Sequence, residues 1–78
     1  MNNYFKFNII FLDPPYKTDY AIKSIQYILK YNLLAEEGII VIETDDEKRI
    51  RDIENYKELE VYDTRKYGIA NIIFVRKG

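Results

Sequence analysis

The chain has 78 residues, which permits one small domain that buries only about 60% of the surface its unfolded form exposes. It contains neither cysteine nor histidine, which excludes disulfides, thiol nucleophiles, imidazole bases and the usual zinc ligand sets, so any metal would need carboxylates alone. Twelve basic and thirteen acidic residues give a net charge of -1, whereas free-standing nucleic-acid-binding proteins usually carry a basic face. Any surface that binds RNA or DNA must therefore be a local one or be supplied by another polypeptide.

Residues 7–12 are predicted to form a β-strand. Phe-Asn-Ile-Ile-Phe-Leu is a nearly continuous apolar run, and it stops at Asp13-Pro14-Pro15. Such a run is typical of a strand that is buried on both faces of a sheet. We therefore expect this strand in a central position.

A helix is predicted next, because apolar residues repeat at helical spacing and form one stripe: Ala21, Ile22, Ile25, Ile28 and Leu29. Thr18 or Asp19 is suited to cap its first turn, and Asn32 is suited to end it in the left-handed conformation. After a short loop with Gly38, residues 39–43 predict a second buried strand. Strand, helix and strand then form a βαβ unit with parallel strands and the helix over one face.

The remaining residues predict a second helix and two antiparallel strands. Asp45 or Asp46 can cap the helix, whose apolar stripe is thin: Ile50, Ile53 and Tyr56. On either side of Arg65-Lys66-Tyr67-Gly68, the chain is again patterned as strands, with residues 69–75 apolar. The prediction is one α/β domain over residues 1–78, in the order β-α-β-α-β-β, with two parallel strands and a C-terminal antiparallel pair.

One edge of the strand at residues 7–12 has no partner in this order. Its unpaired backbone groups would be exposed, so we expect another surface to cover them.

The string Asp13-Pro14-Pro15-Tyr16 is the strongest candidate for chemistry, because it comes directly at the carboxyl end of the first strand. Ligands of open α/β sheets bind outside these strand ends, and two successive prolines hold the backbone extended in advance. The Asp13 carboxylate and the Pro14 carbonyl could each accept a hydrogen bond from the amino group of a base. They would thereby stabilise the positive charge that develops when that nitrogen attacks a methyl sulfonium. The ring of Tyr16 offers a surface on which an extruded base can stack.

Asp-Pro-Pro-Tyr after a hydrophobic strand resembles the catalytic motif of methyltransferases that act on the amino groups of adenine, cytosine or guanine. The strings Asn32-Leu33-Leu34 and Arg65-Lys66-Tyr67-Gly68 make the resemblance specific to one family of these enzymes. Over nearly all 78 residues the chain is similar to the C-terminal half of the RsmD-type family, the 16S ribosomal RNA guanine-N2 methyltransferases. The resemblance implies a partial Rossmann-like class I methyltransferase sheet, S-adenosylmethionine (SAM) as the methyl donor, and Asp13, Pro14 and Tyr16 as the residues that hold the guanine.

The resemblance also implies that the cofactor-binding half is absent. Members of the family carry, upstream of this region, a glycine-rich loop and an acidic residue that together hold the cofactor. The three glycines of this chain, Gly38, Gly68 and Gly78, are scattered and form no such loop. Asp13 and Pro14 would reach only the edge of SAM, so we expect weak or no binding and no turnover by this chain alone.

The other candidate residues have a structural explanation beside the functional one. Lys17 could meet a phosphate or simply be solvated. Tyr67 and Gly68 could shape a substrate loop or form a turn that needs glycine. Residues 43–46 could approach a ligand, but capping of the next helix explains them better. Tyr27 and Tyr31, at helical spacing, are expected to line a packed face.

Three functional hypotheses stay open. The first is an RNA guanine-N2 methyltransferase half that acts on ribosomal RNA with a complementary N-terminal half. The second is an interaction module that forms a homodimer through its first strand, and the third is a fragment of a DNA adenine or cytosine methyltransferase. No apolar stretch exceeds four residues and the amino terminus has no signal pattern, so we expect a cytoplasmic protein without membrane contact.

Overall fold

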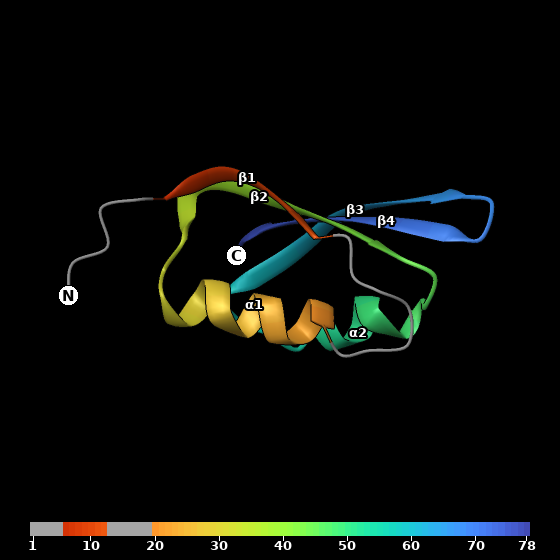
Figure 1. Ribbon diagram of the computed structural model, residues 1–78, viewed down its shortest axis with the longest axis horizontal. Helices are drawn as coiled ribbons and strands as arrows, with labels where there is room; N and C mark the ends of the chain where they lie inside the picture. The colour runs from red at the N-terminus through yellow and green to blue at the C-terminus, as the bar shows by residue number, and fades with distance from the viewer. Residues whose placement is uncertain (1–5, 13–19) are drawn as a thin grey trace.

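The computed structural model describes residues 6–12 and 20–78 (Figure 1). The strands form one sheet in the order β1-β2-β4-β3, with β1 parallel to β2 and the remaining pairs antiparallel. Both helices lie on the same side of this sheet (Figure 1). The predicted α/β order, with two parallel strands and a C-terminal antiparallel pair, is confirmed. The elements are β1 (Phe7–Leu12), α1 (Tyr20–Lys30), β2 (Leu34–Thr44), α2 (Lys48–Glu54), β3 (Leu59–Tyr67) and β4 (Ala70–Lys77).

The hydrophobic core lies between the sheet and the two helices. Successive side chains of a strand point to opposite faces, so cross-strand partners form rows on the helix side, such as Ile10, Ile40 and Val75. The helices contribute fully buried residues to the same core, among them Ile25 and Ile53. We call the helix side of the sheet its inner face. The buried hydrophobic residues are Leu12, Ile25, Ile28, Leu34, Ile40, Ile42, Ile53, Leu59, Ile73 and Val75.

The end of α1 confirms the predicted left-handed terminator. Asn32 has φ 52, and the backbone N–H of Leu33 donates to the carbonyl of Ile28 at 3.0 Å. This is the hydrogen bond of a Schellman ending, in which the chain leaves the helix and turns back toward the sheet. The cap predicted at Thr18 or Asp19 lies outside the described residues.

The start of β2 differs from the prediction. The strand begins at Leu34 rather than residue 39, and Gly38 lies inside it rather than in a loop. The pairing with β1 shifts there, because Phe7 pairs with Leu34 whereas Ile9 pairs with Ile39. A Cβ atom on Gly38 would lie 2.9 Å from the carbonyl oxygen of Phe7. Periodicity missed this segment because long-range pairing with β1, rather than local apolar patterning, makes it a strand.

The position of β1 also differs from the prediction. It lies at the edge of the described sheet rather than in the centre, and alternate side chains on it, Phe7, Ile9 and Phe11, are exposed by 52%, 52% and 73%. Only the side chains that face the helices are covered, and Leu12 is buried among them. In residues 6–12 and 20–78 no strand pairs with the other edge of β1, which confirms the expected open edge.

Two smaller predictions were wrong. The turn between β3 and β4 is Gly68-Ile69 rather than residues 65–68, because a two-residue turn needs the left-handed conformation that Gly68 adopts with φ 61. Tyr27 and Tyr31 do not line a buried face. Both are exposed, and their ring centroids lie 4.6 Å apart on the surface of α1.

Candidate functional site

The candidate site lies at the carboxyl ends of β1 and β2. Because these strands are parallel, their last residues, Leu12 and Thr44, lie at the same end of the sheet. Leu12 pairs with Ile42, so β2 extends two residues beyond β1. The predicted catalytic residues Asp13, Pro14, Pro15 and Tyr16, and the predicted substrate contact Lys17, follow Leu12 in the chain. They lie outside the described residues, so their roles stay predictions.

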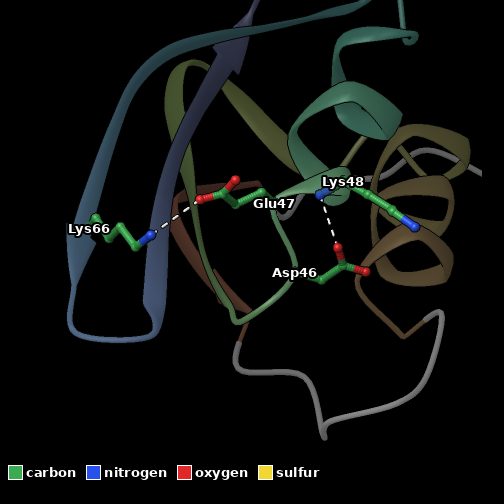
Figure 2. A network of polar contacts seen from close by, with 4 residues as sticks. All are labelled: Asp46, Glu47, Lys48 and Lys66. Carbon is green, nitrogen blue, oxygen red and sulfur yellow. Dashed lines mark hydrogen bonds and ion pairs between the residues drawn. The ribbon is translucent and has the colours of Figure 1, made fainter.

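The loop after β2 is held by two hydrogen bonds between residues that are close in the sequence. The hydroxyl of Thr44 accepts one from the backbone N–H of Asp46 at 3.1 Å. The carboxylate of Asp46 in turn accepts one from the backbone N–H of Lys48 at 3.0 Å, where α2 begins (Figure 2). Asp46 therefore satisfies one of the free N–H groups of the first turn of α2. The N-cap position itself is Glu47, whose side chain makes no capping hydrogen bond, so the predicted cap is one residue off and Asp46 bonds the first turn from the preceding position.

The β3–β4 hairpin meets this loop from the other side. The ammonium of Lys66 lies 3.4 Å from a carboxylate oxygen of Glu47 (Figure 2). Asn71 of β4 pairs with Thr44 of β2, and both are buried. Since Lys66 and Glu47 are both largely exposed, their ion pair contributes about 1 kcal/mol or less. The sheet pairing, more than the ion pair, therefore positions the hairpin.

Between the loop and the hairpin the surface is hollowed, with a volume of about 500 Å³. The residues around it include two lysines, three acidic residues and Asn71. Such a surface can hold a polar ligand, but it offers neither a thiol nor an imidazole. The residues that line the hollow are Asp45, Asp46, Glu47, Lys48, Lys66, Gly68, Ile69 and Asn71.

The structure separates the two predicted substrate contacts of the hairpin. Gly68 lines the hollow, whereas Tyr67 does not. Tyr67 is 62% exposed and interacts with Arg65, two residues before it on the same face of β3. Hydrogen bonds of the Arg65 side chain with Tyr67 and then with Asp63 raise the pKa of the Arg65 guanidinium. A substrate contact by Tyr67 stays a prediction.

Sequence reasoning missed Glu47, Lys66 and Asn71 as members of the site. Lys66 belongs to a string that was noted for its turn, and Asn71 follows that turn by three residues. A buried asparagine at the start of an apolar strand is a usable signal, because a buried amide needs hydrogen-bonding partners. No short sequence pattern predicts that Lys66 contacts Glu47, because the two residues are 19 positions apart.

Two further findings concern metals and membranes. Across residues 6–12 and 20–78, no three carboxylates, imidazoles or thiols cluster closely enough to hold a metal ion. In the same part of the chain no helix is both long and apolar enough to cross a bilayer.

Comparisons with known proteins assign this chain to a family. Residues 1–76 match the family described as Conserved hypothetical protein 95. An uncharacterized methylase of Rickettsia prowazekii (strain Madrid E) is 31% identical over 70 residues, which is 90% of this chain and 28% of that protein.

Solved structures show the same fold. A Haemophilus influenzae protein provisionally described as a methylase superposes with a TM-score of 0.79 at 20% identity, over 99% of this chain and 47% of that one. A conserved hypothetical protein of Streptococcus pyogenes gives a TM-score of 0.71 at 28% identity, over 94% of this chain and 45% of its own. An Escherichia coli protein provisionally described as a methyltransferase gives 0.74 at 19% identity, over 92% of this chain and 38% of that one. The chain therefore spans less than half the length of each of these relatives.

Proposed function

We propose, because this chain belongs to the family described as Conserved hypothetical protein 95, that it is the base-holding part of a SAM-dependent RNA methyltransferase. The single observation that carries the proposal is the Asp13-Pro14-Pro15-Tyr16 string directly after a strand, β1, whose parallel partner opens a polar hollow at the same end of the sheet. Ligands bind at this end of open α/β sheets. The methylase descriptions of the R. prowazekii and H. influenzae proteins support the reaction class.

The proposed substrate is the exocyclic N2 amino group of a guanine in 16S ribosomal RNA. The lone pair of such a nitrogen is delocalised into the ring, so it attacks a methyl group poorly. Hydrogen bonds from the amino group to the Asp13 carboxylate and the Pro14 carbonyl would localise that pair and stabilise the charge that develops. Pro15 would keep the segment extended, and the ring of Tyr16 would stack on the base. Lys17 and Gly68 would contact the flanking nucleotide.

The described residues do not fit SAM as a whole. A nucleoside cofactor in such a sheet is cradled by a glycine-rich turn after a strand. Gly38 instead lies inside β2 and Gly68 in a hairpin turn. Asp13 and Pro14 would touch only the edge of the cofactor. We propose that a complementary N-terminal half supplies the donor site, and that this chain alone is inactive.

The test is methyl transfer from labelled SAM to 16S ribosomal RNA by the full chain together with the part of the S. pyogenes relative that it does not cover. We expect Asp13→Ala to lower the rate by roughly a hundredfold or more, while Glu54→Ala, at an exposed position of α2 outside the hollow, changes it little. Micromolar SAM binding by the chain alone, measured by calorimetry, would contradict the missing donor site. Transfer to DNA adenine or cytosine, with none to RNA, would favour a DNA methyltransferase fragment instead.

A non-catalytic role is the second candidate, and the exposed apolar side chains of β1 favour it. An open strand edge can pair with the same edge of another copy. Sedimentation of the full chain at micromolar concentration separates the two: a stable homodimer supports self-association, and a folded monomer opposes it.

A further inference from the structure

Asn71 is an unusual residue for its position in the sheet. It lies between the apolar residues Ala70 and Ile72 at the start of β4, and asparagine is depleted in strands, where β-branched and aromatic side chains pack better. Asn71 is only 7% exposed, in a row of the inner face with Thr44 and Lys66 as its cross-strand partners. Burying an amide is unfavourable unless its donors and acceptor find hydrogen-bonding partners.

The amide of Asn71 has no such partner among residues 6–12 and 20–78. No hydrogen bond of the described side chains involves it, and the nearby hydroxyl of Thr44 accepts from the N–H of Asp46 instead. None of the fully buried side-chain nitrogen or oxygen atoms lacks a partner, so the amide must reach the surface. It does so at the hollow between the β2–α2 loop and the hairpin, which Asn71 lines.

The shape and charge of this hollow suit a flat, neutral ring better than an anion. Its volume of about 500 Å³ lies within the usual range for small-ligand pockets. Ile69 lines it and is 80% exposed, and a Cβ on Gly68 would meet no atom within 4 Å. Acidic residues outnumber lysines around it, and Lys66 is already ion-paired with Glu47 at 3.4 Å (Figure 2). A phosphate would therefore be held poorly, whereas a ring with hydrogen-bonding groups on its edge could use the amide.

We infer that this hollow holds a second base of the RNA substrate, a cytosine or an adenine, and that Asn71 is a specificity-determining residue that binds the edge of that base. The inference rests on the proposed function, which brings RNA to this end of the sheet. Unpaired RNA bases are recognised by hydrogen bonds to their edges. An amide presents a donor and an acceptor side by side, as in the pairing of asparagine with adenine.

The acidic loop determines which bases fit beside the amide. An amide alone can pair with cytosine or with uracil, because turning it over exchanges its oxygen and its nitrogen. A carboxylate next to it accepts a hydrogen bond from the amino group of cytosine or adenine, but it repels the carbonyl oxygen that uracil carries in the same place. We therefore expect uracil to be rejected. The acidic residues that line the hollow are Asp45, Asp46 and Glu47.

The test measures the binding of short oligocytidylate and oligouridylate to the full chain by fluorescence anisotropy. The two probes carry the same sugars and phosphates, so the difference between them reports the base edge. We expect oligocytidylate to bind roughly tenfold more tightly, with only weak competition by inorganic phosphate. Asn71→Leu should remove most of this preference. The matched control is Asn55→Leu, at the exposed end of α2 outside the hollow, which should keep it.

A measurement on the unsubstituted chain covers the case in which Asn71→Leu fails to fold. The NMR signals of the Asn71 side-chain amide should shift when oligocytidylate is added and stay in place with oligouridylate. Equal affinities for the two probes, an Asn71 amide that does not respond, or full competition by inorganic phosphate would overturn the inference.

The inference and the proposed function fail in different experiments. Asp13→Ala should stop methyl transfer but leave the preference for oligocytidylate unchanged. Methyl transfer to 16S ribosomal RNA without any base preference by this chain would overturn the inference alone. A base preference without methyl transfer would count against the proposed function alone.

Discussion

The inner face of the sheet and the opposite, outer face both carry apolar residues on β1 and β2, but they have different surroundings. The outer rows also continue into charged residues, such as Arg76 beside Ile39 and Asp63 beside Phe74. On the inner face Ile40, Ile42 and Ile73 are fully buried beneath α1 and α2. On the outer face their strand neighbours Ile39, Val41 and Ile72 are only partly covered, and Ile9 and Phe11 are exposed. Alternation along a strand normally pairs an apolar face with a polar one. The described residues therefore bury one face of the sheet and leave apolar side chains of the other face partly covered or exposed.

The largest effect is expected from truncating neighbouring residues on the two faces of β2. Ile40→Ala leaves a cavity in the packed core and should lower the free energy of unfolding by about 2–5 kcal/mol. Ile39→Ala removes partly exposed atoms and should cost about 1 kcal/mol or less. Urea unfolding followed by circular dichroism measures both. Equal losses would mean that the inner and outer faces of β2 are packed alike.

A smaller effect is expected where β1, the least covered strand, joins the sheet. Gly38→Ala would place a Cβ 2.7 Å from Leu34 Cδ1 and 2.9 Å from the Phe7 carbonyl oxygen, so β1 must shift. We expect a loss of about 1–3 kcal/mol, with faster amide exchange in β1 than in β4. The control is Gly68→Ala, which meets no atom within 4 Å and should cost about 1 kcal/mol through its left-handed backbone alone, with no effect on β1. Unchanged exchange in β1 would show that Gly38 does not set the β1–β2 pairing.

The helix layer that covers the inner face depends partly on the hydrogen bond that Asp46 makes near the start of α2. Asp46→Ala removes the acceptor of the Lys48 N–H and should lower stability by about 0.5–2 kcal/mol. Asp45→Ala is the matched control, because Asp45 is the exposed neighbour in the same loop. Thermal unfolding of the two variants measures the difference, and equal midpoints would argue that this hydrogen bond is dispensable.

The smallest effect is expected at the ion pair between Glu60 and Arg76 on the outer face. A double-mutant cycle of Glu60→Gln and Arg76→Gln should give a coupling of about 0.2–1 kcal/mol, because the pair is half exposed. The coupling should shrink in 1 M salt. A larger, salt-insensitive coupling would indicate that this ion pair is more buried in solution than its half-exposed side chains suggest.

Local patterns were sufficient for the elements that depend on neighbours in the chain. The apolar stripe of α1 and the left-handed end at Asn32 follow from spacing and side-chain chemistry, as does the hydrogen bond of Asp46 near the start of α2. The same reasoning misplaced the start of β2 and the β3–β4 turn, because strand pairing at a distance decides both. For the candidate site, Gly68 was anticipated on the hairpin, while the approach of Lys66 to Glu47 was not.

The sequence by itself determined the α/β order and the position of the Asp13–Tyr16 string after the first strand, because these depend on hydrophobic period and on proline and aspartate chemistry. It also indicated that β1 would keep one open edge. Only the tertiary structure decided which side of each strand is buried. That depends on where the two helices pack, and both pack on the same side, so Phe11 and Val41 face outward although they are as apolar as Ile10 and Ile40.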